Sequence, residues 1–130
     1  MKKFSFGKQE RLGSRKILEN IFETGKAINE FPFRLLWIES PVEEKKILKI
    51  AISVPKKKIK RAVDRNKIKR LIKESYRLNK HTILSTIETS GKKFSAIIIF
   101  TGKEEMTYKE TEAKIILTLH RFVQAACKKY

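Results

Sequence analysis

A run of cationic side chains between Pro55 and Lys80 is the part of this sequence best suited to chemistry. It holds twelve lysines or arginines against two acids, a net charge of +10 within the +17 of the whole 130-residue chain. Cations at this density bind phosphates and release condensed counterions, so affinity for a nucleic acid falls steeply with salt. Asn66 adds a neutral donor and acceptor that suits a base edge, a 2′-hydroxyl or a hydrated metal ion. The run therefore predicts the binding of a polyanion.

Residues that could break or form bonds do not gather in the sequence. His81 and His120 lie far apart, and we interpret His120 as a packed or boundary residue of the last helix. Cys127 stands beside two lysines that would favour its thiolate, but we interpret it as a small helix-terminal filler. The chain has no glycine-rich phosphate loop and no zinc-spaced pair of ligands. We expect no catalytic residue and no metal ligand in the protein itself.

The basic run has the periodicity of an amphipathic helix. At 100° per residue, one side carries Ile68, Leu71, Ile72, Ser75 and Leu78, and the other carries Arg65, Asn66, Lys69, Arg70, Lys73 and Arg77. We expect this helix to extend toward residues 83–87, with its apolar side on a core. The cationic side then forms a ridge, which residues 56–58 extend past the helix start.

The other elements follow from capping residues and from alternating strands. We expect a helix at about residues 15–24 between Ser14 as N-cap and Gly25 as C′ residue, and a capping box at Thr107–Glu110 that opens the last helix. The expected strands are residues 31–39, with a short strand at 27–30 before it, 47–54 after a loop at 40–46, and 94–100. Residues 1–13 are expected to be a flexible basic arm. The prediction is a single α+β domain over residues 1–130.

Alternation in the two central strands gives each strand a core side and an outer side. Toward the core we expect Phe33, Leu35, Trp37, Ile50, Ile52 and Val54; on the outer side remain Arg34, Leu36, Ala51 and Ser53. Leu18 and Phe22 of the first helix lie beside this outer side. The outer side is then either a groove for a single RNA strand or a surface that the first helix covers as core, and the sequence leaves both open.

Composition indicates which cellular compartment and which class of partner to expect. A single cysteine excludes an internal disulfide and fits a reducing cytoplasm. The first residues carry no apolar run behind their lysines, so we expect no signal peptide, and the longest apolar run, residues 96–100, is too short to cross a bilayer. A membrane surface is a weaker candidate partner than nucleic acid, because the apolar side of the basic helix lacks Trp and Phe.

Residues 62–74, AVDRNKIKRLIKE, resemble the signature of the protein subunit of bacterial ribonuclease P. The family pattern is roughly R-N-R-x-K-R-x-x-R after a strand ending V-x-K-K, and residues 54–57, VPKK, are similar to that lead-in. The likeness covers nearly the whole chain, and the opening at residues 4–8, FSFGK, resembles members from the Bacteroidetes branch. It implies the order αβββαβα, a mixed four-stranded sheet and a left-handed βαβ crossover through the basic helix. General sheet statistics favour a right-handed crossover, and we follow the family.

The resemblance also implies a ribonucleoprotein that removes the 5′ leader of precursor tRNA endonucleolytically. In that family the RNA subunit carries the chemistry with Mg²⁺, and the protein binds the RNA subunit and the leader, with no obligate protein partner and no membrane. The positions that match the RNA-subunit-binding motif and its lead-in are Lys56, Lys57, Arg61, Arg65, Asn66, Lys67, Lys69, Arg70 and Lys73, and those that match the leader cleft are Leu18, Phe22, Arg34, Leu36 and Ser53.

This sequence departs from the family pattern at three of those positions. Lys67 stands where the motif has its second Arg, so it keeps the charge without the bidentate fork. Leu18 and Leu36 stand where other members often carry aromatic residues, so stacking on the leader is left to Phe22. The alternatives are a structured-RNA-binding or ribosome-associated protein with no role in cleavage, a membrane-surface protein, and a free-standing nuclease, which the missing acid–base cluster disfavours.

Overall fold

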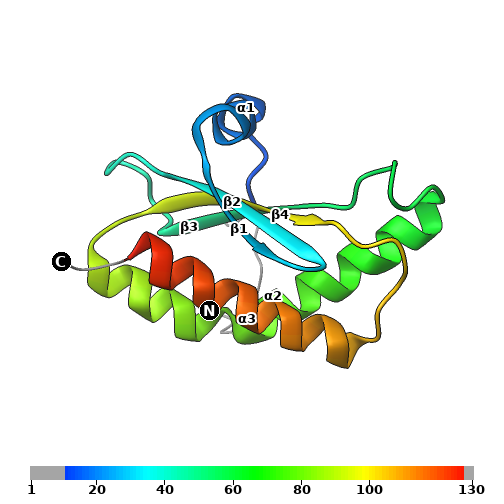
Figure 1. The fold of residues 1–130 in the computed structure, drawn as a ribbon. Helices are drawn as coiled ribbons and strands as arrows, with labels where there is room; N and C mark the ends of the chain where they lie inside the picture. The colour runs from blue at the N-terminus through cyan, green and yellow to red at the C-terminus, as the bar shows by residue number, and fades with distance from the viewer. Residues whose placement is uncertain (1–10, 128–130) are drawn as a thin grey trace.

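The computed structural model describes residues 11–127, and its elements follow the predicted order αβββαβα. They are α1 (Arg15–Thr24), β1 (Lys26–Glu30), β2 (Phe33–Glu39), β3 (Leu48–Ser53), α2 (Ala62–Ser90), β4 (Phe94–Phe100) and α3 (Tyr108–Ala126). Helix α1 lies on one face of the sheet, and α2 and α3 lie on the other (Figure 1). The chain is therefore a single α+β domain of three layers.

The mixed sheet has the strand order β1-β2-β4-β3. Strand β2 pairs antiparallel with both β1 and β4. Strands β3 and β4 are parallel neighbours, and α2 connects them. The predicted parallel pair is thus confirmed, and the left-handed sense of its crossover stays a prediction. The short strand before β2 is also confirmed as β1, and β2 begins at Phe33 rather than Phe31 because Phe31 and Pro32 form the turn.

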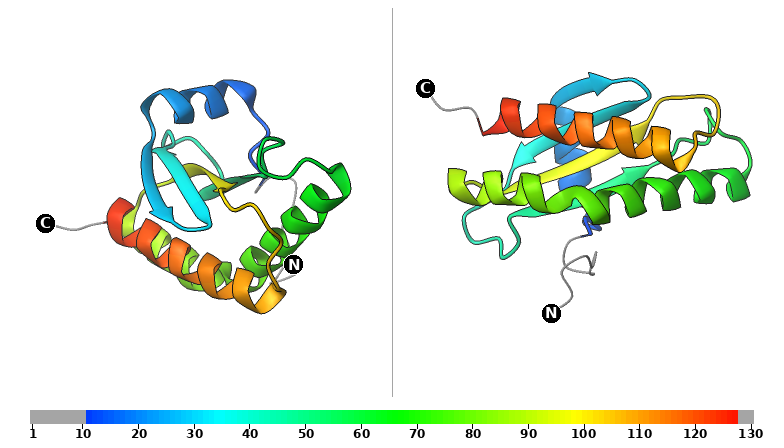
Figure 2. Two further views of the ribbon diagram at one scale, coloured as in Figure 1. Left: turned by 45° about the vertical axis from the view of Figure 1, so that its right-hand side comes forward. Right: turned by 90° about the horizontal axis from the view of Figure 1, so that it is seen from below.

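The main core fills the space between the sheet and the two long helices. Phe33, Leu35, Trp37 and Ile50 are buried there as predicted, whereas Ile52 is only partly buried. The ring of Phe122 on α3 packs edge-on against Trp37, with ring centroids 5.4 Å apart. Helices α2 and α3 lie side by side across this face (Figure 2). Helix α3 starts at the predicted capping box, in which Thr107 and Glu110 bond reciprocally.

A smaller apolar cluster lies on the opposite face of the sheet, beneath α1. It consists of Leu12, Ile21, Leu36 and Ile97. The prediction of a flexible arm is wrong for Arg11–Gly13, since Leu12 is buried and its backbone N–H bonds to the Ile50 carbonyl at 2.9 Å. Residues 1–10, the rest of that predicted arm, lie outside the described residues.

Gly25 closes α1, although not in the conformation that we expected. Its φ of −68° is ordinary extended backbone, so the residue is not a left-handed C′ glycine. A side chain there would overlap the carbonyl oxygen of Ile21 and press on that of Trp37. Glycine is therefore needed at this position because α1 and β2 approach closely.

Helix α2 differs from the predicted basic helix along its buried side. It begins at Ala62, and residues 56–58 form a turn that follows Pro55. Leu78, predicted to face the core, is 39% exposed, whereas Tyr76 is buried. Leu78 lies about 120° around the helix axis from Ile72, so it falls outside the buried stripe of α2 that packs against α3. The predicted extension past residue 83 is confirmed, and Gly91 ends the helix with φ 75°.

Candidate nucleic-acid interface

The turn before α2 presents cations in a fixed arrangement. We call residues 55–61 the basic turn. The backbone N–H groups of Lys58 and Ile59 donate to the Pro55 carbonyl at 3.1 and 3.2 Å, and the side chain of Ile59 is buried in the main core. All five cations of the turn, Lys56, Lys57, Lys58, Lys60 and Arg61, are exposed. Ile59 thus anchors a turn whose remaining side chains point to solvent.

The first turns of α2 continue this cationic surface. Asn66, Lys67, Arg70 and Lys73 are exposed, and Arg65 and Lys69 are half-buried at the edge of the helix. Asn66, Arg70 and Lys73 follow one another at i, i+4 and i+7, so they share one side of the helix. The nine predicted RNA-subunit-binding residues all lie on the basic turn and the first turns of α2, and we call them the basic surface: Lys56, Lys57, Arg61, Arg65, Asn66, Lys67, Lys69, Arg70 and Lys73.

Arg65 has a structural role that the sequence pattern did not indicate. Its Nη1 donates to the carbonyl oxygens of Ile59 at 3.0 Å and Lys60 at 2.7 Å. These charge-assisted bonds connect the helix to the basic turn that precedes it. Arg65 therefore braces the turn, besides lying on the basic surface. The sequence places Arg65 six and five residues after Ile59 and Lys60, within reach of their backbone, and it gives no other indication of these bonds.

Few carboxylates neutralise the basic surface within residues 11–127. Arg61 pairs with Asp64 at 3.8 Å, and Lys67 pairs with Glu105 at 3.6 Å. Both pairs are solvent-exposed, and such pairs contribute between 0 and about 1 kcal/mol. The other cations of the surface form no ion pair within those residues. The surface thus keeps its charge for an anionic partner.

The predicted leader cleft lies on the outer face of the sheet, where the strand register decides which residues meet. Arg34, Ile99 and Ser53 form one row across β2, β4 and β3, and the next row is Leu36, Ile97 and Ala51. Helix α1 covers the second row, so Leu36 is only 7% exposed and packs in the small cluster. The row of Arg34 and Ser53 is more open, since Arg34 is exposed and Ser53 half-buried.

The two cleft residues of α1 differ in exposure. Leu18 packs partly against the small cluster, whereas Phe22 is 59% exposed. Helix α1 therefore covers the middle of the outer face as core, which was one of the two alternatives drawn from the sequence. An open strip with an exposed aromatic ring remains beside it, and the binding of an RNA strand there stays a prediction.

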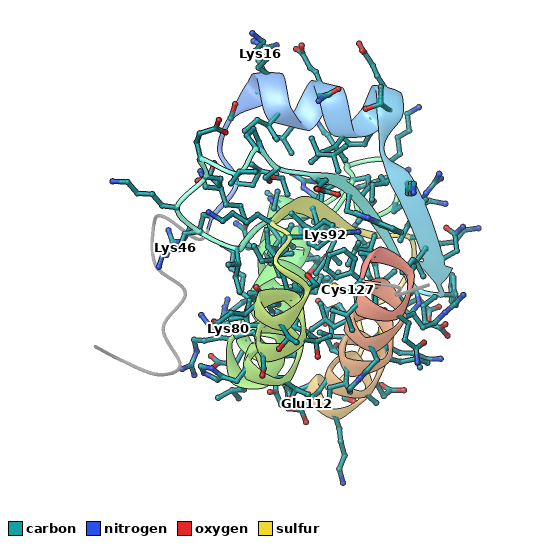
Figure 3. The ribbon with its side chains drawn as sticks, turned by 90° about the vertical axis from the view of Figure 1, so that its left-hand side faces the viewer. Lys16, Lys46, Lys80, Lys92, Glu112 and Cys127 are labelled. Carbon is teal, nitrogen blue, oxygen red and sulfur yellow. The ribbon has the colours of Figure 1, made fainter. Side chains whose placement is uncertain are left out.

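The other side of α1 carries a groove of different character. It measures about 750 Å³, and its walls include Glu19 and Glu23 of α1, Glu39 at the end of β2, and Glu44. Lys49 lies 3.2 Å from Glu44 and, chiefly by a hydrogen bond, lowers the pKa of that carboxyl group. Lys16, which Figure 3 shows on α1, also lines this groove. Carboxylates outnumber cations in the lining of this groove, so it favours an RNA strand less than the strip beside Phe22 does.

Groups for protein-based catalysis stay dispersed in the fold. His81 lies half-buried on α2, and His120 is exposed on α3 beside a small cavity between the two helices, so of the predicted packed or boundary positions it occupies a boundary one. Cys127 is half-buried at the end of α3. Among residues 11–127, no three His, Cys, Asp or Glu side chains gather where they could hold a metal ion. Over the same residues, no helix is long and apolar enough to cross a membrane.

Comparison with known proteins shows which family the chain belongs to. A family model described as Ribonuclease P matches residues 6–123. The ribonuclease P protein component of Porphyromonas gingivalis is 36% identical over 85 residues, which are 65% of this chain and only 62% of that relative. The component of Geotalea uraniireducens is 32% identical over 121 residues, 93% of this chain and 97% of the relative.

Solved structures agree with the fold. The RNase P protein from Thermotoga maritima is 27% identical with a TM-score of 0.68, covering 86% of this chain and 96% of that one. The Staphylococcus aureus RNase P protein has a TM-score of 0.70 at 24% identity, covering 87% of this chain and 94% of that one, and supports the fold alone.

Proposed function

We propose that this chain, which belongs to the ribonuclease P protein family, is the protein component of a cytoplasmic ribonucleoprotein that removes the 5′ leader from precursor tRNA. The matched residues 6–123 include both the basic surface and the outer face beside α1. In this proposal the RNA subunit is the catalyst, and the protein holds the RNA subunit on one surface and the leader on another.

The basic surface is the observation that carries the proposal. It combines an anchored turn, braced by Arg65, with a helix whose cations have few carboxylate partners. Such a surface fits the phosphates of a folded RNA, because several charge-assisted contacts form without ordering a loop first. The central Asn66 is exposed among these cations and can read a base edge or a 2′-hydroxyl.

The leader fits the open strip beside α1. Phe22 offers an exposed ring on which a base can stack, and Arg34 offers a cation for the backbone. Ser53 and Leu18 border the strip, and Leu36, which is buried, supports its floor from below. The glutamates of the groove on the other side of α1 repel an RNA backbone, so we place the leader on the side of α1 that carries Phe22.

The chemistry belongs to the RNA subunit in this proposal. We propose that RNA holds the Mg²⁺ that the family implies; among residues 11–127 no three possible ligands come together. The runner-up is a structured-RNA-binding protein without a role in cleavage, which the same basic surface would also serve.

Reconstitution separates these two functions. The purified protein is added to the ribonuclease P RNA of the same genome at low Mg²⁺, with a precursor tRNA as substrate. We expect the protein to switch on cleavage at the mature 5′ end, because it raises the affinity for substrate and for metal ions. Tight binding to that RNA without any gain in cleavage would support the runner-up instead.

Variants then assign the two surfaces. Arg70→Ala with Lys73→Ala removes two exposed cations and should weaken binding to the RNA subunit by about tenfold or more. Thr82→Ala with Ser85→Ala, exposed on the same helix, is the matched control and should leave binding unchanged. Phe22→Ala should instead remove the dependence of substrate affinity on leader length. If that dependence survives in Phe22→Ala, the leader does not lie on this strip.

A further inference from the structure

A second exposed aromatic residue lies at a pocket that neither proposed surface uses. The pocket, of about 760 Å³, opens between the β1–β2 turn, the loop from β4 to α3, and Lys58 of the basic turn. Phe31 stands on its wall at the tip of the β1–β2 turn and is 71% exposed. An aromatic ring exposed on the wall of a pocket is available to stack on a flat ligand that enters it.

The turn that carries Phe31 is held firmly. The backbone N–H of Thr101 donates to the Pro32 carbonyl at 2.7 Å, and Pro32 itself is buried. At Gly102 a Cβ would lie 2.7 Å from the ring of Phe100 and 3.1 Å from Pro32, so the loop backbone packs directly against the turn. The ring of Phe31 is therefore presented from a fixed support, which reduces the ordering entropy that binding must overcome.

Most charged side chains around the pocket have a partner in the described part of the fold, and a few do not. Glu30 is neutralised by Arg121 at 2.6 Å and Lys114 at 4.0 Å, and Glu105 by Lys67. Glu110 accepts bonds from Thr107 as part of the capping box, which lowers the pKa of its carboxyl group. Within residues 11–127, the pocket residues Lys58, Lys103 and Glu104 form no ion pair.

We propose that this pocket binds one unpaired nucleobase of the RNA subunit, stacked on Phe31. This rests on the proposed function, because the occupant is the RNA that the basic surface binds. Lys58 and Lys103 suit the flanking phosphates, and Glu104 suits the amino or ring N–H donors of a Watson–Crick edge. The RNA subunit is the source rather than the leader, because Lys58 belongs to the basic turn and Lys67 of the basic surface bonds to Glu105 at the pocket wall.

Binding of the variants to the ribonuclease P RNA, without substrate, tests this site. Phe31→Ala should weaken affinity by about tenfold, as expected for loss of one base–aromatic stack. Phe31→Trp should keep the affinity, and its fluorescence should be quenched on titration with the RNA, above the background of the buried Trp37. The matched control is Val42→Ala, which removes an apolar side chain 86% exposed at the other end of the sheet and should bind as the wild type does.

Chemical footprinting of the RNA completes the test. The wild-type protein should protect one unpaired nucleotide that becomes reactive again with Phe31→Ala, while the other protections persist. Equal affinity of Phe31→Ala and wild type, or an unchanged footprint, overturns the site. If Phe31→Ala weakens only the binding of precursor tRNA, the base comes from the leader and the assignment to the RNA subunit is wrong. Failure of the wild-type protein to bind the RNA at all would instead refute the proposed function, and this site with it.

Discussion

The two halves of α2 share one buried stripe but have opposite surfaces. Residues 62–80 bury Ile68, Ile72 and Tyr76, and residues 81–90 continue the stripe with Ile83 and Ile87. The first half carries seven lysines or arginines, whereas the second carries none. The helix therefore has one continuous buried stripe, whereas its exposed side is cationic only in the first half, where we propose that an anionic partner binds.

The second half shows what the exposed side of this helix looks like without such a partner. Thr86 and Thr89 donate their hydroxyl groups to the carbonyls of Thr82 and Ser85 in the preceding turn. These side chains satisfy their own backbone and offer no net charge, although Thr is a weak helix former. The second half packs on α3 without any lysine or arginine, so its exposed side does not need cations to remain helical.

The largest expected effect tests whether the stripe is truly continuous. Ile72→Ala and Ile83→Ala each remove a fully buried side chain, one from each half. Both should lower the free energy of unfolding by about 2–5 kcal/mol, because each leaves a cavity in the same core. Urea denaturation measures the losses, and the exposed Thr82→Ala should stay within about 0.5 kcal/mol of wild type. A much smaller loss for Ile83→Ala would mean that the second half unfolds separately.

Two arginines of the first half should differ in how they act on RNA binding. Arg65 braces the basic turn through the Ile59 and Lys60 carbonyls, whereas Arg70 is exposed and has no such bond. In a double-mutant cycle with Lys56→Ala plus Lys57→Ala, Arg65→Ala should show a coupling of about 1 kcal/mol in RNA affinity, since it also disorders the turn. Arg70→Ala should be additive with the same changes.

Hydrogen exchange in the free protein gives an independent readout of the same brace. The amides of Lys58 and Ile59, which bond to the Pro55 carbonyl, should exchange faster in Arg65→Ala and at the wild-type rate in Arg70→Ala. Slow exchange in both variants, together with additive affinities, would show that Arg65 acts only by direct contact with RNA.

These features differ in how far the sequence could predict them. Strand alternation placed Phe33, Leu35 and Trp37 correctly, because α2 and α3 bury this face along most of β2. Periodicity could not choose between Leu78 and Tyr76, since both side chains are apolar enough for a core. Contacts from α3 decide the choice: Asn79 donates to Glu112 at 2.9 Å, which fixes the side of α2 that faces α3. Figure 3 shows Glu112 at this helix pair.

The candidate sites were predictable only in part, for a similar reason. The order of charges located the basic surface, since adjacent residues of a helix stay adjacent in space. It could not reveal that Arg65 bonds backward to the turn, or that Leu12 bonds to Ile50 at the edge of the sheet. Both depend on where distant backbone groups come to lie. Burial of Leu36 likewise follows from the path of α1 across the sheet rather than from the alternation of β2.

The smallest expected effect concerns the two ends of α2. At its C-terminus Gly91 adopts the left-handed conformation that suits a helix end, whereas at its N-terminus Arg61 is the N-cap and makes no side-chain capping bond. Arg61→Ser should therefore raise the free energy of unfolding by about 0.5–1 kcal/mol, because a serine hydroxyl can accept a free N–H of the first turn. The same change should weaken RNA binding and reduce the salt dependence by about one counterion.

Arg61→Ala separates these two effects of the N-cap. It should weaken RNA binding as much as Arg61→Ser does, without the gain in stability, in parallel urea and salt titrations. If both variants bind RNA as the wild type does, Arg61 lies outside the interface and the basic surface ends at the helix. If both bind weakly and only the serine variant is more stable, then the arginine at the N-cap favours RNA binding and lowers the stability of the helix. The cationic end of α2 would then be less stable than a better N-cap would make it, because RNA binding needs that cation.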